Sequence, residues 1–550
     1  MKIKHNKNWS YIFLLTICFG FSSFSNAQSN GFEVIKNMEL LDLIYQHLDM
    51  YYVDEPQPGK MSKTGIDAML RELDPYTVYY HENNIEDYRM ITTGQYGGIG
   101  AIIRKIDDYS YIIEPREGKP AQLAGAKAGD KILTIEGKNM KDKSSEEVSD
   151  ALKGPKGTTI DVTVLRDGEK ITLAITRDEI KIDDAPFTRM FDNNIGYIKL
   201  NSFMPQSTSA DVKKAYVELK SRGITSLIFD LRGNGGGLMI EAVKIVNMFV
   251  KKGQSVVTTR GRVEDENRDY LTTDAPLDLD IPIVVLVDEN SASASEIVAG
   301  SLQDLDRAVI IGTTSFGKGL VQRTYDLKYG SKMKLTIAKY YTPSGRCVQR
   351  LEYYDKELGV RPQEIADSLV KKFKTVNGRN VIDGRGIEPD FTIDKNELSR
   401  LTSTLYAENI LFNFATDYTK SHATIPQAEL FKLSDSEYEA FKTYALSKEF
   451  DYSTASEEML KKMKETAEEE GYLEEATVEY DALLAKVVPS KKRDLDKFEP
   501  EIKELLENEI VSRYYYQNGR IINSFNNDRF VLKAIEVLKD NKKYNGTLNP

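Results

Sequence analysis

The sequence is poor in the residues that most often carry metal sites, covalent cross-links and histidine-dependent catalysis. Its 550 residues include two cysteines, one tryptophan and four histidines. Cys18 lies in an apolar N-terminal stretch that we expect to be removed, which leaves Cys347 without a partner for an internal disulfide. No HExxH, CxxC, GxxxxGKS or GxxxxGKT motif is present, so the sequence predicts no metal site and no bound cofactor.

Histidine is too scattered for a Ser-His-Asp triad. Outside the N-terminal stretch the chain has His47, His81 and His422, which lie far apart in the sequence in segments expected to be helices or loops. None of them falls in the α/β region described below. A serine nucleophile in that region would therefore need a different base.

The charge balance excludes another group of functions. Lys and Arg number 74 against 85 Asp and Glu, which gives a formal net charge of −11. This acidic balance argues against a nucleic-acid partner and against a basic membrane-binding surface. With 41% hydrophobic and 29% charged residues, the chain has the composition of a globular protein.

The N-terminus has the organisation of a secretory signal peptide. Three lysines precede the apolar run YIFLLTICFGF, and SNA at 25–27 fits the small-x-small pattern before a cleavage site. The alternatives are lipid attachment at Cys18 and a membrane anchor, for which this run is shorter than the ~20 residues that span a bilayer. We expect residues 1–27 to be removed, so that the mature chain starts near Gln28. The product should be exported to the periplasm or cell envelope without stable membrane insertion.

Changes of pattern divide the rest of the chain into four regions. Residues 28–90 have the three- and four-residue apolar spacing of helices. Residues 91–180 contain short alternating strands with Gly and Asp turns, and two short helices. Residues 181–395 alternate strands with helices, and residues 396–550 are charged, poor in glycine and helical in pattern.

Residues 181–395 predict a largely buried sheet. The apolar runs IGYIKL, SLIFDL, IPIVVLV and AVIIG are typical of strands. They alternate with helices that we expect near 208–222, 237–251 and 295–305. This alternation predicts βαβ crossovers and an α/β fold, to which LTIAKYYT adds a late strand.

A run of small residues follows the third of these strands. NSASASEIVAG, at 290–300, alternates Ser291, Ser293 and Ser295 with alanines before a helical stretch. One interpretation is a narrow turn with a capping box, in which Ser293 caps the helix and Glu296 reaches back. The other is a nucleophilic serine held at a strand-to-helix turn. The run alone leaves both interpretations open, and also the choice among the three serines.

A lysine after the fourth strand offers a base. Lys318 lies between two glycines in TTSFGKGLVQ, where other backbone can approach it closely. To accept a proton at neutral pH it must be uncharged, and burial lowers the pKa of a lysine because the ammonium loses its hydration. Gln322, four residues on, has an amide that could orient the lysine nitrogen. The alternative for Lys318 alone is a solvated surface lysine.

Three consecutive glycines follow the second strand and precede a helix. Gly235, Gly236 and Gly237 could turn backbone N–H groups toward a developing oxyanion, or they could simply form a tight turn. The glycine, serine and lysine segments each follow one strand of the same α/β region. Open α/β sheets bind ligands at the carboxyl ends of their strands, which favours one shared catalytic site.

Six motifs occur along this region in a fixed order. They are GYIKLNSF, LIFDLRGNGGGL, VVLVDENSASASEIVAG, DRAVIIG, SFGKGLVQ and YYTPSGR. In this order they resemble the motifs of the C-terminal processing peptidases, also called tail-specific proteases. YGGIGAII followed by PAQLAGAKAGDKILTIEG resembles the PDZ domain that precedes the catalytic region in that family.

The resemblance implies a fold and gives each region an identity. The fold is α/β, with a crotonase- or ClpP-like catalytic core, an inserted or preceding β-rich PDZ domain, and helical N- and C-terminal regions. The implied domains are a signal peptide (1–27), an N-terminal helical region (28–90), a PDZ domain (91–180), a Ser-Lys peptidase catalytic domain (181–395) and a C-terminal helical region (396–550).

The resemblance also implies which residues act. In that family the catalytic serine lies 25 positions before the catalytic lysine, so Lys318 as base selects Ser293 as nucleophile over its two neighbours. Gln322 matches the glutamine that supports the lysine. The oxyanion-hole N–H donors implied are Ala294 and one glycine of the run at 235–237, with Gly236 and Gly237 as the candidates.

The PDZ-like loop suggests the substrate. The implied carboxylate-binding residues, whose backbone would face a chain terminus, are Gly98, Ile99, Gly100 and Ala101. The resemblance therefore implies an exported serine endopeptidase that grips polypeptide substrates with exposed C-termini and cleaves them upstream. An adaptor protein and a homo-oligomer stay open as further partners.

Two other functions remain as alternatives. One is a non-catalytic PDZ-containing binding or adaptor protein of the periplasm, built on the same scaffold. The other is a Ser-Lys amidase or esterase for small molecules, in which a PDZ domain would have no obvious use. Retention of both Ser293 and Lys318 favours the protease.

Overall fold

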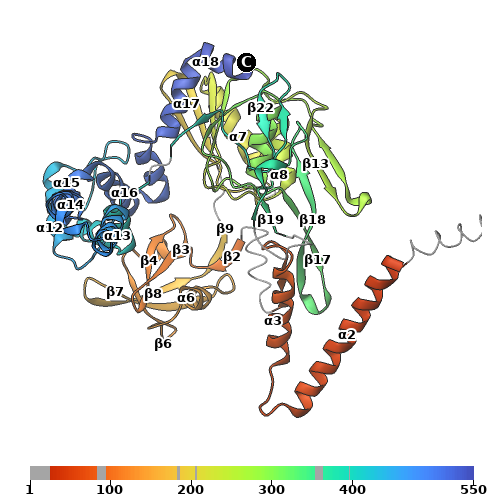
Figure 1. Cartoon of the computed structure of the whole chain (residues 1–550), viewed down its shortest axis with the longest axis horizontal. Coiled ribbons are helices and arrows are strands. Elements are labelled where there is room, and N and C mark those ends of the chain that lie inside the picture. Colours follow the sequence, from red (N-terminus) through yellow and green to blue (C-terminus); the bar gives the residue numbers. More distant parts are fainter. Residues whose placement is uncertain (1–24, 83–94, 182–185, 205–206, 354–362, 395–396) are drawn as a thin grey trace, which may run out of the picture.

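The molecule has four visible parts. The computed structural model describes residues 25–82, 95–181, 186–204, 207–353, 363–394 and 397–550. Figure 1 shows a helical arm at the N-terminal end, a small β-rich module, an α/β body, and a cluster of helices beside the β-rich module. The mixed α/β fold with a β-rich module and helical ends, expected from the sequence, is confirmed. The domain boundaries given above stay a prediction.

The α/β body is built on a six-stranded sheet of order β10-β11-β12-β15-β16-β23. Only β10 and β11 are antiparallel, and all other neighbours in this order are parallel. The four apolar runs of the sequence form the central strands, because parallel strands bury both faces. The strands are β10 (Phe187–Phe191), β11 (Ile195–Lys199), β12 (Ser226–Asp230), β15 (Ile283–Val287), β16 (Val309–Gly312) and β23 (Phe391–Thr392).

Helices cover both faces of this sheet, so the body has three layers. Alternate strand residues enter opposite cores: Phe229 and Val285 pack with the helices of one face, and Ile228 and Val284 with those of the other. The first face carries α7 (Thr208–Ser221), α8 (Met239–Asn247) and α9 (Ala294–Asp304), and the second carries α17 (Arg529–Lys539) and α18 (Asn541–Leu548). The last two helices of the C-terminal region therefore complete the core of the α/β body.

A second sheet flanks the body and includes a strand from the N-terminal region. Its order is β1-β18-β13-β14, with β17 paired to β18. LTIAKYYT is in a strand as expected, but that strand, β18, belongs to this sheet. β1 lies in a region whose pattern predicted only helices. The strands are β1 (Val78–Tyr80), β13 (Ser255–Gly261), β14 (Arg268–Leu271), β17 (Leu320–Asp326) and β18 (Lys332–Tyr341).

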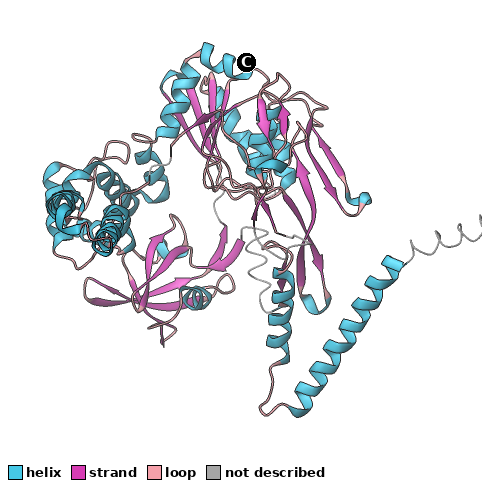
Figure 2. Cartoon of the chain, in the orientation of Figure 1, coloured by secondary structure: helices cyan, strands magenta, loops and turns pink. Residues whose placement is uncertain are grey.

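The β-rich module combines an open sheet with two short helices, and Figure 2 shows it as mostly strand (magenta). The sheet order is β3-β4-β5-β7-β8, with β6 paired to β5, and a separate ribbon pairs β2 with β9. Its strands are β2 (Gln95–Gly98), β3 (Ala101–Ile106), β4 (Tyr109–Pro115), β5 (Lys131–Ile135), β6 (Lys138–Asn139), β7 (Thr159–Arg166), β8 (Glu169–Thr176) and β9 (Asp178–Lys181). Its helices are α5 (Pro120–Leu123) and α6 (Ser145–Leu152), which pack on the same core as the sheet.

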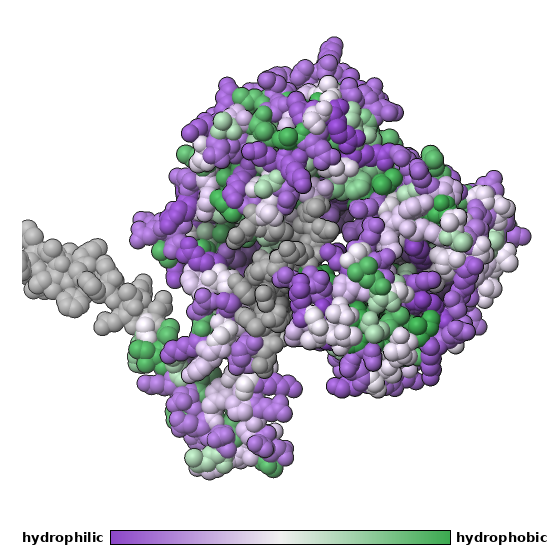
Figure 3. All heavy atoms as spheres, turned by 180° about the vertical axis from the view of Figure 1, so that it is seen from behind, coloured by the Kyte–Doolittle hydropathy of each residue, from purple (hydrophilic) through white to green (hydrophobic). Residues whose placement is uncertain are grey.

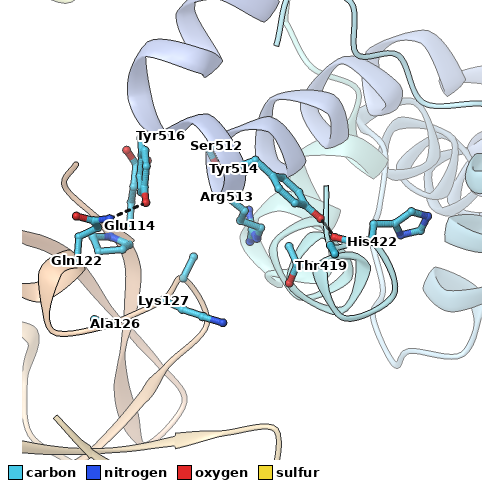
Figure 4. Close-up of a pocket in the computed structure, with 14 residues that line it drawn as sticks. Glu114, Gln122, Ala126, Lys127, Thr419, His422, Ser512, Arg513, Tyr514 and Tyr516 are labelled. Atoms are coloured by element: carbon cyan, nitrogen blue, oxygen red, sulfur yellow. Dashed lines mark hydrogen bonds between the residues drawn. The ribbon is translucent and has the colours of Figure 1, made fainter. Parts of the chain in front are cut away.

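The remaining C-terminal helices form a cluster with a core of its own. This cluster docks against the β-rich module through an ion pair between Glu114 and Arg520 (3.0 Å) and a hydrogen bond from Gln122 to Tyr516 (3.2 Å). Figure 4 shows the hydrogen bond between Gln122 and Tyr516, beside a pocket of about 410 Å³ between the two parts. The helices are α10 (Arg400–Ala407), α11 (Ile410–Ser421), α12 (Asp435–Leu446), α13 (Ala455–Glu469), α14 (Leu473–Val487), α15 (Lys491–Lys497) and α16 (Glu499–Ser524).

The N-terminal arm consists of α2 (Ser25–Tyr51) and α3 (Pro58–Arg71). Many of its large apolar side chains are exposed, and Figure 3 shows apolar residues on the arm beside the mostly hydrophilic surface of the body. Over the described ranges, no helix combines the length and the apolar character needed to cross a membrane. Residues 1–24 of the predicted signal peptide lie outside the described residues.

Candidate active site

Three loops leave the same edge of the parallel sheet. They follow β12, β15 and β16, which are direct neighbours, and they carry the glycine run, the serine run and the lysine respectively. A backbone hydrogen bond of 3.0 Å from Ala292 to Asn234 joins the first two loops. Another of 3.0 Å, from Phe316 to Ser291, joins the second and third. The three segments singled out in the sequence therefore lie together at the carboxyl ends of the strands.

The three serines have different environments. Ser291 is fully buried, and its hydroxyl donates to the Leu231 carbonyl at 2.9 Å. Ser295 is fully buried too, and its hydroxyl donates to the Asn234 carbonyl at 2.8 Å. Ser293 is partly exposed. The two flanking hydroxyls thus hold the loops together, and Ser293 is the one of the three that a substrate can reach.

The backbone at Ser293 is strained. Its φ of 56° and ψ of −112° lie in a region that residues with a side chain rarely adopt and that costs about 1–3 kcal/mol. The Ser293 N–H donates to Glu296 (2.8 Å), and its carbonyl accepts from Tyr340 (3.1 Å) and Ile297 (2.9 Å). Glu296 reaches back as a capping box predicts, but an N-cap residue has extended backbone. A strained strand-to-helix turn is instead typical of an exposed nucleophile.

The glycines allow a close approach to this turn. A Cβ at Gly236 would lie 2.8 Å from the Ser293 Cβ and 2.9 Å from the Ala294 nitrogen. A Cβ at Gly237 would lie 2.5 Å from the carbonyl carbon of Phe203. Both glycines also have positive φ, of 100° and 145°. Side chains at these positions would strain the backbone and, at Gly236, close the space in front of the Ala294 N–H.

The backbone N–H groups of Gly235–Gly237 differ in whether they are free to donate a hydrogen bond to a ligand. That of Gly236 donates to the Asn234 side-chain oxygen at 2.9 Å. Those of Gly235 and Gly237 have no acceptor within the described part of the chain. Ala294 is the first residue of α9, so its N–H has no partner inside the helix. In this geometry Gly237 is a better candidate than Gly236 for the second oxyanion donor.

A buried carboxylate joins the serine turn to the lysine loop. Glu296 is fully buried, and one of its oxygens accepts from the N–H groups of Ser293 (2.8 Å) and Lys318 (2.9 Å). The other accepts from the Ser315 hydroxyl (2.6 Å) and the Gly317 N–H (2.7 Å). Burial raises the pKa of Glu296, and the four donors oppose that rise. The sequence offered only its spacing from Ser293 as a signal, and its role as the link between the loops was missed.

Lys318 has an environment that favours the neutral amine. Its Nζ lies 4.3 Å from the centroid of the Tyr76 ring, and it forms no ion pair or hydrogen bond with the described residues. The pKa of Lys318 is lowered to about 8, mainly by burial and to a smaller extent by the positive charge of Lys334. The negative charges of Glu296 and Asp74 act in the opposite direction. A sizeable fraction of Lys318 is therefore uncharged slightly above neutral pH.

Gln322 has a partner other than the lysine. Its side-chain nitrogen donates to the Thr336 hydroxyl on β18 at 3.2 Å. No hydrogen bond joins Gln322 to Lys318 among the described residues. Its role in orienting the lysine stays a prediction.

A buried network of ion pairs lies next to the loop that carries the glycine run. Arg232 pairs with Asp230 (2.6 Å) and with Asp528 (2.7 Å), and the Tyr197 hydroxyl donates to Asp230 (2.6 Å). Burial alone would raise the pKa of Asp230, but Arg232 and Lys199 hold it below its ordinary value. Asp528 also caps α17. The network, which sequence patterns did not predict, ties the loop to the C-terminal helices.

The predicted carboxylate-binding loop lines a small groove in the β-rich module. Gly98, Ile99 and Ala101 form part of this groove, with Leu152 of α6 among the other lining residues, and its volume is about 30 Å³. The N–H groups of Ile99 and Gly100 have no acceptor within the described ranges. The groove lies on a different module from the serine and lysine loops.

Replacing Glu296 by glutamine is expected to lower kcat by about 10²-fold, because it would displace Ser293 and Lys318, the predicted catalytic residues, and small displacements of catalytic groups have effects of that size. An amide nitrogen cannot accept a hydrogen bond, so two of the four donors lose their acceptor and the two loops separate. The measurement is kcat and KM on a peptide substrate, with thermal melting to check folding. Glu289→Gln changes an exposed carboxylate of the same loop, which accepts a hydrogen bond from the Thr313 hydroxyl (3.0 Å), and should change kcat by no more than a few-fold. A folded Glu296→Gln enzyme with wild-type kcat would show that the link is dispensable.

Three parts of the chain match models of known protein families. The model of "Peptidase family S41" matches residues 194–365, the "PDZ domain" model matches 97–176, and "Probable PDZ-protease, C-terminal helical domain" matches 401–538. A "Carboxy-terminal-processing protease" of Bartonella bacilliformis is 36% identical over 341 residues, which cover 60% of this chain and 75% of that protein. A "Probable CtpA-like serine protease" of Staphylococcus aureus is 32% identical over 385 residues, covering 68% and 75%.

A solved structure, "Photosystem II D1 C-terminal processing protease", is 28% identical over 65% of this chain and 88% of its own, with a TM-score of 0.37. The family matches together with the relatives define the class of protein, a serine-type peptidase with a PDZ domain. The chain belongs to peptidase family S41. The resemblance found in the sequence is thereby confirmed, whereas the roles of the individual site residues stay predictions.

Proposed function

We propose that the protein is an exported endopeptidase that hydrolyses peptide bonds with a Ser293–Lys318 dyad and selects substrates by their C-terminal tails. One observation carries the proposal: an accessible serine on a strained turn and a partly buried lysine lie on loops joined by one buried carboxylate, Glu296. A binding or adaptor protein has no need of this arrangement. Cleavage of casein or of a tail peptide by the purified protein tests the proposal, and its absence would favour the adaptor alternative.

The first chemical step is proton transfer coupled to attack. The neutral amine of Lys318 accepts the proton of the Ser293 hydroxyl while the serine oxygen bonds to the scissile carbonyl carbon. The carbonyl oxygen becomes an oxyanion and accepts hydrogen bonds from the N–H groups of Ala294 and Gly237. The N-terminus of α9 adds positive potential at the same point.

The second step splits the intermediate. The Lys318 ammonium returns its proton to the leaving nitrogen, the C–N bond breaks, and the acyl group stays on Ser293 as an ester. A water molecule then gives a proton to the neutral lysine and attacks the ester carbonyl. The bond between the acyl carbon and the serine oxygen then breaks, and the Lys318 ammonium gives its proton to that oxygen, which frees the carboxylic acid and restores the Ser293 hydroxyl. One basic group thus serves both half-reactions.

The β-rich module supplies the proposed tail specificity. The free N–H groups of Ile99 and Gly100 suit a terminal carboxylate, and a tail can pair as an added strand along β3 opposite α6. Substrates are therefore polypeptides whose last residues are unfolded and whose terminal carboxylate is free.

Gly100→Val is expected to weaken cleavage of substrates with free C-termini by about tenfold, the loss expected from one or two charge-assisted hydrogen bonds. Gly100 has a φ of 69°, and a Cβ there would lie 2.5 Å from the Lys119 Cβ. The substitution therefore deforms the loop. The measurement is the ratio of kcat/KM for the free-acid and amidated forms of one tail peptide. A ratio near one in the wild-type enzyme would remove the case for tail recognition, and a short peptide that bypasses the groove serves as the control.

Export and self-association complete the proposal. N-terminal sequencing of the protein recovered from the cell envelope should begin near Gln28.

A second copy of this chain is the partner we propose for α2, because Val34, Leu41 and Leu48 recur at seven-residue intervals and the first two are exposed. Leu41→Lys should then lower the molar mass measured by light scattering. An unchanged molar mass would show that this face of α2 is not the contact between two copies of the chain.

A further inference from the structure

An aromatic residue from the N-terminal region covers the lysine. Tyr76 lies in the turn after α3, and the centroid of its ring is 4.3 Å from the Lys318 Nζ. The two residues belong to segments far apart in the sequence. β1, which follows the turn directly, pairs with β18 with Val78 opposite Lys334, and this pairing brings the turn to the lysine.

The turn that carries Tyr76 is rigid. The side chain of Asp74, itself mostly buried, accepts hydrogen bonds from the N–H groups of Tyr76 and Thr77, both at 2.8 Å, and from the Thr77 hydroxyl at 2.9 Å. The Tyr76 hydroxyl shares a hydrogen bond of 3.2 Å with that of Tyr353, and the two rings meet edge to face at 5.7 Å. Both ends of the Tyr76 side chain are therefore held.

We propose that Tyr76 is a positioning residue for the Ser293–Lys318 reaction: its ring forms an apolar wall that keeps water from the Lys318 amine and directs that amine toward the serine. This inference rests on the proposed function, because it needs Lys318 to act as the base. The N-terminal region then contributes to the active site through the turn that ends at β1.

Two effects of the ring on Lys318 oppose each other. The face of an aromatic ring attracts an ammonium, which favours the charged lysine. Exclusion of water removes hydration from the ammonium, which favours the neutral amine. Loss of hydration can move the pKa of a lysine further than one cation–π contact does, and burial is the largest influence on Lys318. The wall effect should therefore dominate.

The other charged groups around Lys318 come from three elements. Lys334 of β18 favours the neutral amine, whereas Glu296 of α9 and Asp74 of the turn favour the ammonium. None of these groups is removed by a change at Tyr76. A shift in the titration of Lys318 in Tyr76 variants would thus report the ring itself.

Tyr76→Ala tests the proposal through the pH dependence of kcat on a short peptide that does not engage the PDZ groove. Water enters beside Lys318, so the midpoint of the rising limb should move upward by about one pH unit and kcat at pH 7 should fall about tenfold, with KM nearly unchanged. Tyr76→Phe keeps the ring and should keep the wild-type midpoint. Tyr79→Ala removes a neighbouring ring on β1 and should also keep the wild-type midpoint. Thermal melting verifies folding.

The results separate a failure of the proposed role of Tyr76 from a failure of the proposed Ser293–Lys318 function. A folded Tyr76→Ala enzyme with the wild-type midpoint, or with a lower one, overturns this inference. Where Tyr76→Ala does not fold, Tyr76→Gln gives the same test, because a polar amide of similar length replaces the apolar wall. Ser293→Ala and Lys318→Arg are measured in parallel. Activity in either of those contradicts the proposed function itself, whereas their inactivity together with an unchanged Tyr76→Ala profile contradicts only the role of Tyr76.

Discussion

Ser293→Ala is expected to reduce the cleavage rate of a tail peptide by at least ~10³-fold, the usual consequence of removing a nucleophile. The fold should be unaffected, because the Ser293 backbone keeps its bonds to Glu296 and Tyr340. The measurement is the single-turnover rate together with thermal melting.

The neighbouring serines provide matched controls for this result. Ser291→Ala and Ser295→Ala each remove a buried hydrogen bond, so each should lower the free energy of unfolding by about 1–3 kcal/mol. Their turnover at a temperature where they remain folded should stay within a few-fold of wild type. Wild-type activity in Ser293→Ala, with activity lost in one of the other two, would show that the nucleophile has been misassigned.

Lys318→Arg is expected to lower the rate by at least ~10²-fold although it keeps a cation. Arginine cannot lose its proton in a protein, so it cannot accept one from the serine. In the wild-type enzyme Lys318 is charged below its pKa and neutral above it, and only the neutral form acts as a base. The rate should therefore rise with pH through a midpoint near 8, because burial lowers the pKa of Lys318 to about that value.

The pH profile separates this base from the alternatives. A rising limb with a midpoint near 5 would indicate a carboxylate base, and full activity in Lys318→Arg would exclude the lysine. A chelator should leave the rate unchanged, because the proposed steps use no metal ion.

The sequence predicted the central sheet and the meeting of its three loops well. Each central strand is a nearly continuous apolar run, since a parallel strand between two helical layers buries both faces. The loops after β12, β15 and β16 carry small residues, and the carboxyl ends of parallel neighbours necessarily share one edge. Local pattern and general topology were sufficient for this part.

The connections between distant segments could not be predicted from local pattern. Glu296 has the spacing of a capping residue, and only the closure of the Ser315–Lys318 loop over α9 gives it three further donors. Asp74 and Tyr76 occupy an ordinary turn, and their place beside Lys318 depends on the pairing of β1 with β18. Hydrogen bonds between segments so far apart leave no periodicity in the sequence.

Which core each C-terminal helix packs against could not be predicted from the sequence either. The apolar stripe of α17 predicts that the helix is half-buried, but it does not say against what. In the structure Val531 and Ala534 pack on the α/β sheet, while Leu506 and Ile510 of α16 belong to the core of the helical cluster. Spacings of three and four residues are both typical of one helix face, so the pattern does not say which core each helix joins.

The most direct test of the central claim is a crystal structure of the enzyme with a peptidyl boronic acid. Boron forms a reversible covalent bond with an activated serine oxygen and then has the tetrahedral shape of the reaction intermediate. The account predicts a bond from boron to the Ser293 oxygen, one boronate oxygen within hydrogen-bond distance of the Ala294 and Gly237 N–H groups, and the Lys318 amine beside the serine oxygen. Boron bound to a different residue, or an inhibited enzyme with Ser293 unmodified, would contradict it.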